Sequence, residues 1–141
     1  MNEPLTEQLL DELLSSSSVE EFIGSNDLRT QSLPDYLARM LKEKGLAQSK
    51  TVRAAGISPT YGYQIFKGER KPSREKLLAI ALAMRLNLRE TNRLLQIGEV
   101  NGLYAKNRRD AIIIFCIDHQ RSLAETNTAL YEFGERTIDQ Q

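Results

Sequence analysis

The chain has 141 residues, which is enough for one domain with a buried core. Hydrophobic residues make up 40% of the sequence, charged residues make up 27%, and the mean hydropathy is −0.43, which excludes a largely disordered chain and a membrane-spanning one. A single cysteine, Cys116, and a single histidine, His119, exclude a fold built on disulfides or zinc, so we expect neither a metal nor a cofactor.

The charges balance overall but are segregated along the chain. Residues 1–32 hold seven acids and one base, residues 33–98 hold thirteen bases and five acids, and residues 99–141 hold five bases and seven acids. The basic middle segment suggests an anionic partner such as nucleic acid, although scattered surface charge is the alternative. The acidic start lacks the basic end and the apolar stretch of a signal peptide, and no apolar run reaches the length of a membrane helix, which favours a cytoplasmic location.

Residues 1–32 predict an acidic N-terminal helical extension. Leucines recur at helical spacing over residues 4–14 with acids on the other face, so this segment predicts an amphipathic helix. A capping box at Ser18 predicts a second, short helix that ends near Gly24, and the polar residues 25–32 predict a linker. The extension has two interpretations: a cap that packs its leucines on the body of the protein, which is the commoner arrangement, or a removable shield over the basic face.

Residues 33–98 predict five helices joined by short connections. The start signals are side chains that cap a first turn, and the stop signals are glycines: Ser32, Ser58, Ser73 and Asn87 begin helices, and Gly45, Gly56, Gly68 and Gly98 end them. The predicted helices run from 33 to Gly45, 46–55, 59–66, 74–86 and from Asn87 to 97. Nothing in this span resembles a strand, so we predict an all-α fold.

Residues 99–141 predict a C-terminal helical hairpin extension. The apolar run 111–117 suits a buried strand as well as a buried helix. Because helices flank it and no partner strand is predicted, we predict a helix that belongs to the core. Ser122 begins a further helix that runs to Gly134. We expect the hairpin, roughly Arg108 to Gly134, to provide the surface for a homodimer or another protein partner.

The most informative segment is Gln48 to Lys67, where two short helices meet at Gly56. Glycine accepts the positive φ that a tight turn needs, and Ile57 after it is predicted to point into the core. This spacing is that of a helix-turn-helix, whose second helix enters the major groove. With the segments AQSKTVRAAGIS and QIFKGERKPS and the Gly68-x-x-x-Pro72 link, residues 33–98 resemble the repressor and Cro type of domain, the XRE family of bacterial and phage regulators. The resemblance implies a five-helix, lambda-repressor-like domain.

Three positions depart from the family's usual pattern. Thr51 stands where an apolar residue is usual, Val52 where a small residue is usual, and Gly62 where a branched apolar residue is usual. Val52 and Gly62 are expected to face each other where the two helices cross. A large residue on one side and none on the other conserves the packed volume, so we interpret the pair as a compensated swap.

The resemblance also implies which residues contact duplex DNA. Gln48 is expected to bind a phosphate, and Thr60 and Gln64 are expected to read base edges, with Gln64 able to bond adenine in two places. Pro59 lies on the same face, Tyr61 and Tyr63 flank it, and a basic group follows on the connecting loop, where such proteins touch the DNA backbone. The members of this basic group are Lys67, Arg70, Lys71 and Arg74.

Other chemistry has little support in the sequence. Cys116 and His119 are too few for a zinc site, and no glycine-rich phosphate loop or nucleophile with a base stands out, so we do not expect an enzyme. We therefore expect a sequence-specific transcription regulator. The alternative is a protein-interaction adaptor that has the helix-turn-helix fold without DNA binding.

Overall fold

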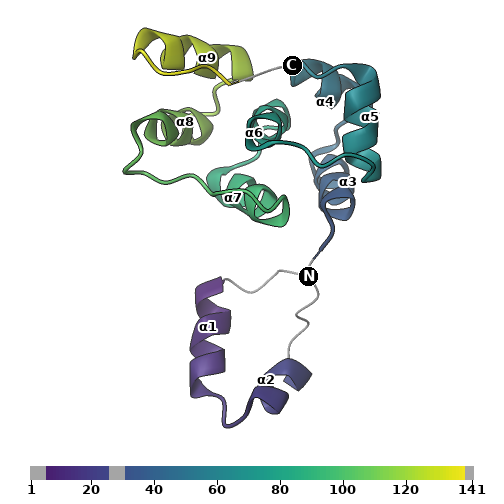
Figure 1. The fold of residues 1–141 in the computed structure, drawn as a ribbon, viewed down its shortest axis with the longest axis vertical. Helices are drawn as coiled ribbons and strands as arrows, with labels where there is room; N and C mark the ends of the chain where they lie inside the picture. Colours follow the sequence, from purple (N-terminus) through teal and green to yellow (C-terminus); the bar gives the residue numbers. More distant parts are fainter. Residues whose placement is uncertain (1–5, 26–30, 139–141) are drawn as a thin grey trace. The chain divides into compact units, whose positions relative to one another are not determined.

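A computed structural model describes residues 6–25 and 31–138, and these residues form nine α-helices and no strand (Figure 1). The all-α prediction is confirmed. By its internal contacts the chain divides into two compact units, Met1–Thr30 and Gln31–Gln141. None of the helices in the described residues is long and apolar enough to cross a membrane.

The first unit contains two short helices, α1 (Thr6–Ser15) and α2 (Val19–Ser25). The hydroxyl of Ser16 donates to the carbonyl of Glu12 (2.7 Å), which competes with continuation of α1. The predicted cap of the second helix is present, because the Ser18 Oγ accepts the N–H of Glu21 (3.0 Å). The first residues of the predicted helix 4–14 and most of the predicted linker lie outside the described residues.

The second unit contains the other seven helices. They are α3 (Leu33–Lys44), α4 (Gln48–Ala54), α5 (Pro59–Lys67), α6 (Arg74–Ala83), α7 (Leu88–Ile97), α8 (Arg108–Asp118) and α9 (Leu123–Glu132). In Figure 1, α6 lies at the centre of this unit, and it packs against α4, α7 and α9. Every residue of α6 from Lys76 to Leu82 is buried, so this helix forms the middle of the hydrophobic core.

The predicted helix starts are confirmed by hydrogen bonds. The side chains of Ser32, Ser58, Ser73, Asn87 and Ser122 each accept a backbone N–H from the first turn that follows. Capping boxes at Asn87 and Ser122 add the reciprocal bond from a glutamate side chain. These bonds satisfy N–H groups that a helix cannot pair internally, which is why short polar side chains before an apolar stripe located the helices correctly.

The end of α6 differs from the sequence prediction. α6 was expected to reach Leu86 but ends at Ala83, because Arg85 takes a left-handed conformation (φ 58°) and turns the chain. The N–H of Leu86 then donates to the carbonyl of Ala81 (3.0 Å), and its side chain is buried. Leu86 therefore contributes to the core without belonging to the helix, and its apolar character alone gave the wrong boundary.

The start of α4 also needs correction, whereas α7 ends at the predicted residue. α4 begins at Gln48 and not at Leu46, because Leu46 closes the preceding helix by donating its N–H to Leu41 (2.9 Å). α7 ends before Gly98 as expected, but the left-handed residue is Glu99 (φ 61°). Gly98 serves close packing instead, since a Cβ there would overlap the side chain of Leu77.

Two ion pairs of opposite polarity connect α6 to α8. The Arg74 Nη2 donates to the Asp110 Oδ2 (3.0 Å), which also accepts the backbone N–H of Tyr104 (3.0 Å). One residue later on α6 and one residue earlier on α8, Arg109 binds both carboxylate oxygens of Glu75 (3.0 and 2.5 Å). Asp110 is buried, so these partners compensate its carboxylate for the loss of contact with water. The C-terminal hairpin is thereby fixed to the helices that precede it.

The apolar run 111–117 is helical, as predicted, but it is not wholly a core segment. Ile113 and Ile117 are buried, whereas Phe115 on the other side of α8 is 55% exposed. Its ring stacks on His119, with the ring centroids 3.9 Å apart. The prediction of a core helix is therefore right for one face of α8 and wrong for the other.

Candidate nucleic-acid interface

Helices α4 and α5 form the predicted helix-turn-helix. Gly56 is in the left-handed region (φ 70°), and Ile57 is buried with its N–H donating to the carbonyl of Val52 (3.2 Å). Ser58 then caps α5, and Pro59 occupies its first turn, where a missing N–H costs nothing. The turn and the start of the second helix therefore follow directly from four consecutive residues.

The unusual core positions pack as predicted. A Cβ at Gly62 would overlap both Cγ atoms of Val52, so the two residues face each other in direct contact. Val52 is buried, and Thr51 beside it is 3% exposed. The large residue on α4 fills the space that the glycine on α5 leaves, which confirms the geometry of a compensated swap.

The outer face of α5 carries the predicted base-reading residues. Pro59 and Thr60 are exposed, Tyr63 is 51% exposed, and Gln64 is half-buried. Thr60 and Gln64 are four residues apart and thus share one side of the helix. Gln48 is exposed at the first position of α4.

A stack of cations around Tyr61 supports this face. The guanidinium carbon of Arg70 lies 4.7 Å from the centre of the Tyr61 ring, and the Lys76 Nζ lies 5.4 Å from the same centre. The Nε of Arg70 also donates to the Oε1 of Gln64 (3.1 Å). Arg70 therefore contacts both the ring of Tyr61 and the amide of Gln64, and it ties the predicted reading helix to the loop that follows it.

Lys76 is a part of this group that the sequence did not reveal. Its side chain is 5% exposed, and its Nζ is buried without a hydrogen-bond partner in the described part of the chain. A buried ammonium is costly unless something compensates it, and the Tyr61 ring supplies a negative face. Lys76 lies fifteen residues after Tyr61 on another helix, so no local pattern marked the contact.

The remaining predicted cations differ in what they contact. Lys67 lies over the Tyr63 ring (5.2 Å), and a hydrogen bond with Tyr63 raises the pKa of its ammonium above the ordinary value. Lys71 pairs with Glu99 (2.8 Å), and both side chains are exposed. Arg74 is half-buried and donates to Asp110 and to the carbonyls of the α7–α8 connection. Arg74 is thus engaged in the junction of α6 with α8, while Lys67 and Lys71 lie at the surface.

Cys116 and His119 do not form a joint site. Cys116 is a buried free thiol, whereas the His119 ring is at the surface with its Nδ1 2.9 Å from the Phe115 carbonyl. Across residues 6–25 and 31–138 no group of three or more potential ligands among His, Cys, Asp and Glu is close enough to hold a metal ion.

The geometry of α4 and α5 agrees with a comparison to known families. Residues 37–90 match the family model described as Helix-turn-helix. Residues 37–90 therefore resemble a helix-turn-helix domain of the XRE type. The match covers most of α3 and continues to the start of α7, and it includes all the predicted DNA contacts. Comparison of the chain with curated proteins and with solved structures gave no match. The helix-turn-helix domain supports the general function of a DNA-binding regulator.

Proposed function

We propose that the protein is a sequence-specific transcription regulator that reads the major groove with α5. The observation that carries this proposal is the outward face of α5, where Thr60 and Gln64 lie together beside the surface cations Lys67 and Lys71. A helix of this diameter fits the major groove, and the first turns of the second helix reach the base edges in such domains.

Gln64 has the strongest case as a base reader. Arg70 donates to its Oε1, which fixes the plane of the amide group before DNA arrives. The carbonyl oxygen keeps a second lone pair and the amide nitrogen has two N–H donors, so the group retains the two bonds that recognise adenine. We assign Arg70 the task of positioning this amide, in addition to its positive charge. Thr60 contributes a hydroxyl for a base edge or a methyl group for thymine.

The surrounding residues have the chemistry for backbone contacts. Gln48, Lys67 and Lys71 are exposed and suit phosphate oxygens, and Tyr63 offers a hydroxyl and a broad apolar ring. Pro59 has no polar side chain, so we assign it apolar contact with a base or sugar. We leave Arg74 out of the phosphate-binding set because its guanidinium is held by Asp110 and two backbone carbonyls.

Selection of bound fragments from random duplexes tests the proposal. The wild-type chain should enrich a common sequence, and Gln64→Ala should relax the preference at one or two base pairs while other positions keep theirs. Gln96→Ala is the matched control, because Gln96 is an exposed glutamine at the end of α7, and it should enrich the wild-type sequence. A pool that stays random with the wild-type chain would contradict the proposal.

A specific observation favours one second candidate, an interaction adaptor without DNA binding. The hairpin of α8 and α9 leaves Phe115, Tyr131 and Phe133 exposed, and exposed aromatic side chains commonly mark protein interfaces. Measuring the affinity for duplex DNA at low salt distinguishes the two functions. Phosphate contacts give a regulator measurable affinity for any duplex there, whereas an adaptor binds none.

A further inference from the structure

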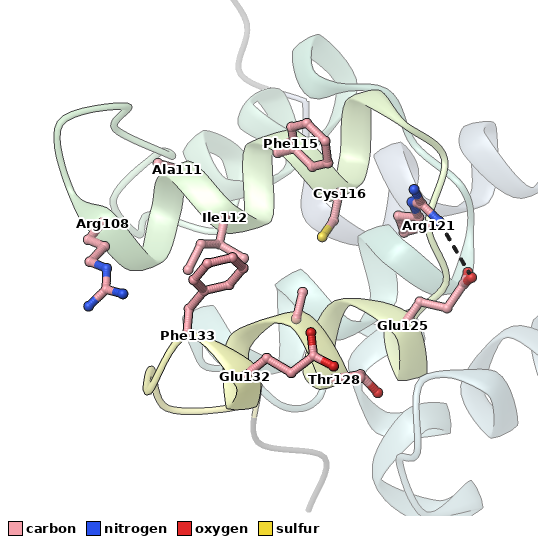
Figure 2. A pocket seen from close by; sticks show the side chains of 11 residues that line it. Arg108, Ala111, Ile112, Phe115, Cys116, Arg121, Glu125, Thr128, Glu132 and Phe133 are labelled. Carbon is pink, nitrogen blue, oxygen red and sulfur yellow. Dashed lines mark ion pairs between the residues drawn. The ribbon is translucent and has the colours of Figure 1, made fainter.

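A pocket of about 630 Å³ lies between α8 and α9 (Figure 2). The small side chains Ala111, Cys116 and Ala129 line it together with Ile112 and Phe133. In each helix the lining residues recur every three or four positions, so one continuous stripe of α8 faces one continuous stripe of α9. Two parallel stripes with small residues between larger ones form a groove of the kind that receives other helices.

α8 is apolar on two opposite sides, but the second unit buries only one of them. Ile113 and Ile117 pack into the core, while Phe115 and Ile112 lie on sides that are exposed or half-buried. A helix that is apolar all round is normally buried all round. The sequence of α8 is thus that of a helix covered on both sides, and the groove is the side that residues 31–138 leave open.

The charges around the groove identify what covers it. Arg108 and Glu132 lie at one end, where α8 begins and α9 ends, and Arg121 and Glu125 lie at the other end (Figure 2). Arg108 also pairs with Glu135 (3.5 Å), and Arg121 lies 4.0 Å from Glu125, so both signs of charge are present at each end. A strongly acidic or basic partner finds no complementary field on such a rim. The rim of a second copy does provide a complementary field, because each cation of one copy can face an anion of the other copy.

We propose that the α8–α9 groove binds the same groove of a second copy of this chain, to form a four-helix bundle. Two rotations bring the grooves face to face. A two-fold axis along the groove places α8 on the partner's α9, and Arg108 then faces the partner's Glu132 while Arg121 faces the partner's Glu125. An axis across the groove places α8 on the partner's α8 and sets Arg108 against the partner's Arg121. Charge complementarity selects the first.

This pairing lies outside the matched domain and does not depend on DNA. Residues 108–133 follow the segment 37–90 that the family model covers, so the surface is an addition of this chain. If α5 reads DNA, the bundle joins two reading helices under one two-fold axis, as a palindromic site requires.

Sedimentation equilibrium of the full chain tests the pairing. The expected mass is twice the 16.0 kDa of the chain, without DNA present. Phe115→Glu should weaken the dimer at least about tenfold, because it places a charge on the apolar lining of the groove. Tyr131→Glu is the matched control: Tyr131 is 79% exposed on the same hairpin but does not line the groove, and its variant should remain dimeric.

Exchanging the charges of the rim tests the orientation. Arg108→Glu and Glu132→Arg should each weaken the dimer about tenfold, since a symmetric interface contains each pair twice, and the double variant should regain wild-type affinity. A two-fold axis across the groove predicts the opposite change in dimer affinity, because Arg108→Glu would then strengthen the dimer. Thermal unfolding of each variant establishes that the fold is intact.

Several results would overturn the proposal. A wild-type chain that stays monomeric at about 1 mM would do so, and so would equal effects of Phe115→Glu and Tyr131→Glu. Saturable binding of a small apolar dye in the groove of a monomeric wild-type chain would replace the second copy with a small ligand. Failure of the DNA-binding proposal would give a different result: the chain would sediment as a dimer but would not bind duplexes at any salt concentration.

Discussion

The helices α3 to α7 and the hairpin α8–α9 bury their apolar side chains to different extents. In the first region the residues of α6 from Lys76 to Leu82 are buried, and the exposed face of α5 is polar at Thr60 and Gln64. In the hairpin Phe115 and Phe133 are both 55% exposed. The first region shares one hydrophobic core with the hairpin and offers hydrogen-bonding groups at its surface. The second offers apolar surface, of the kind that a partner covers on association.

The largest effect we predict comes from breaking the junction between these two regions. Asp110→Ala should lower the free energy of unfolding by about 3 kcal/mol, because it leaves the half-buried Arg74 and the N–H of Tyr104 without their acceptor. Urea denaturation followed by circular dichroism measures the change. Asp118→Ala removes an exposed carboxylate from the same helix and should cost less than about 0.5 kcal/mol. Equal effects of the two variants would contradict a structural role for the junction.

Within the helix-turn-helix domain, the contact between α4 and α5 can be broken and repaired. Val52→Ala should destabilise by about 2 kcal/mol by leaving a cavity, and Gly62→Ala should destabilise by about 1 kcal/mol because its Cβ collides with Val52. The double variant should be more stable than either single variant, since the new Cβ fills the cavity and alanine suits a helix better than glycine. Chemical denaturation of all four proteins gives the coupling energy, and strictly additive effects would show that the two residues do not share one space.

A smaller effect concerns the polar surface of the first region. Lys71→Ala should reduce the slope of log affinity against log salt concentration by about one unit, if Lys71 binds one phosphate. Fluorescence anisotropy with a labelled duplex at several salt concentrations measures the slope. Lys106→Ala removes an exposed cation between α7 and α8 and should leave it unchanged. A Lys71→Ala slope equal to that of wild type would remove Lys71 from the interface.

The smallest predicted effect is a gain of affinity. Glu99 binds Lys71, and the hydrogen bond from this lysine lowers the pKa of the Glu99 carboxyl below its ordinary value, so the acid is charged and competes with phosphate at neutral pH. Glu99→Gln should raise the affinity for duplex DNA about two- to threefold at low salt, in keeping with the small energy of an exposed ion pair. The gain should be absent when Lys71 is already alanine. The same gain in both backgrounds would mean that Glu99 acts through its charge alone and not through Lys71.

Local signals in the sequence were sufficient for most of the first region. Capping side chains such as Ser58 and Asn87, and glycines such as Gly56, act on the residues immediately beside them, so they placed the helices of the domain within a few residues. The contact of Val52 with Gly62 was also predictable, because the spacing of a helix-turn-helix fixes which residues cross.

Signals between distant residues were not available from the sequence. Arg74 resembled the neighbouring loop cations, but its carboxylate partner Asp110 lies 36 residues away. Lys76 gave no sign that it would be buried against Tyr61. In the run 111–117 all residues are apolar, so periodicity could not tell which side of α8 the chain would leave exposed. Each of these features depends on how whole helices pack, and local patterns do not determine that.

The central claim, that α5 reads bases, is tested most directly by comparing the affinity of wild type and Gln64→Ala for a selected duplex and for a scrambled duplex at one salt concentration. We predict that the variant loses about 1–3 kcal/mol on the selected duplex, roughly 5- to 150-fold in affinity, and almost nothing on the scrambled one. Equal affinity of the wild-type chain for both duplexes, or an equal loss on both in the variant, would contradict the claim.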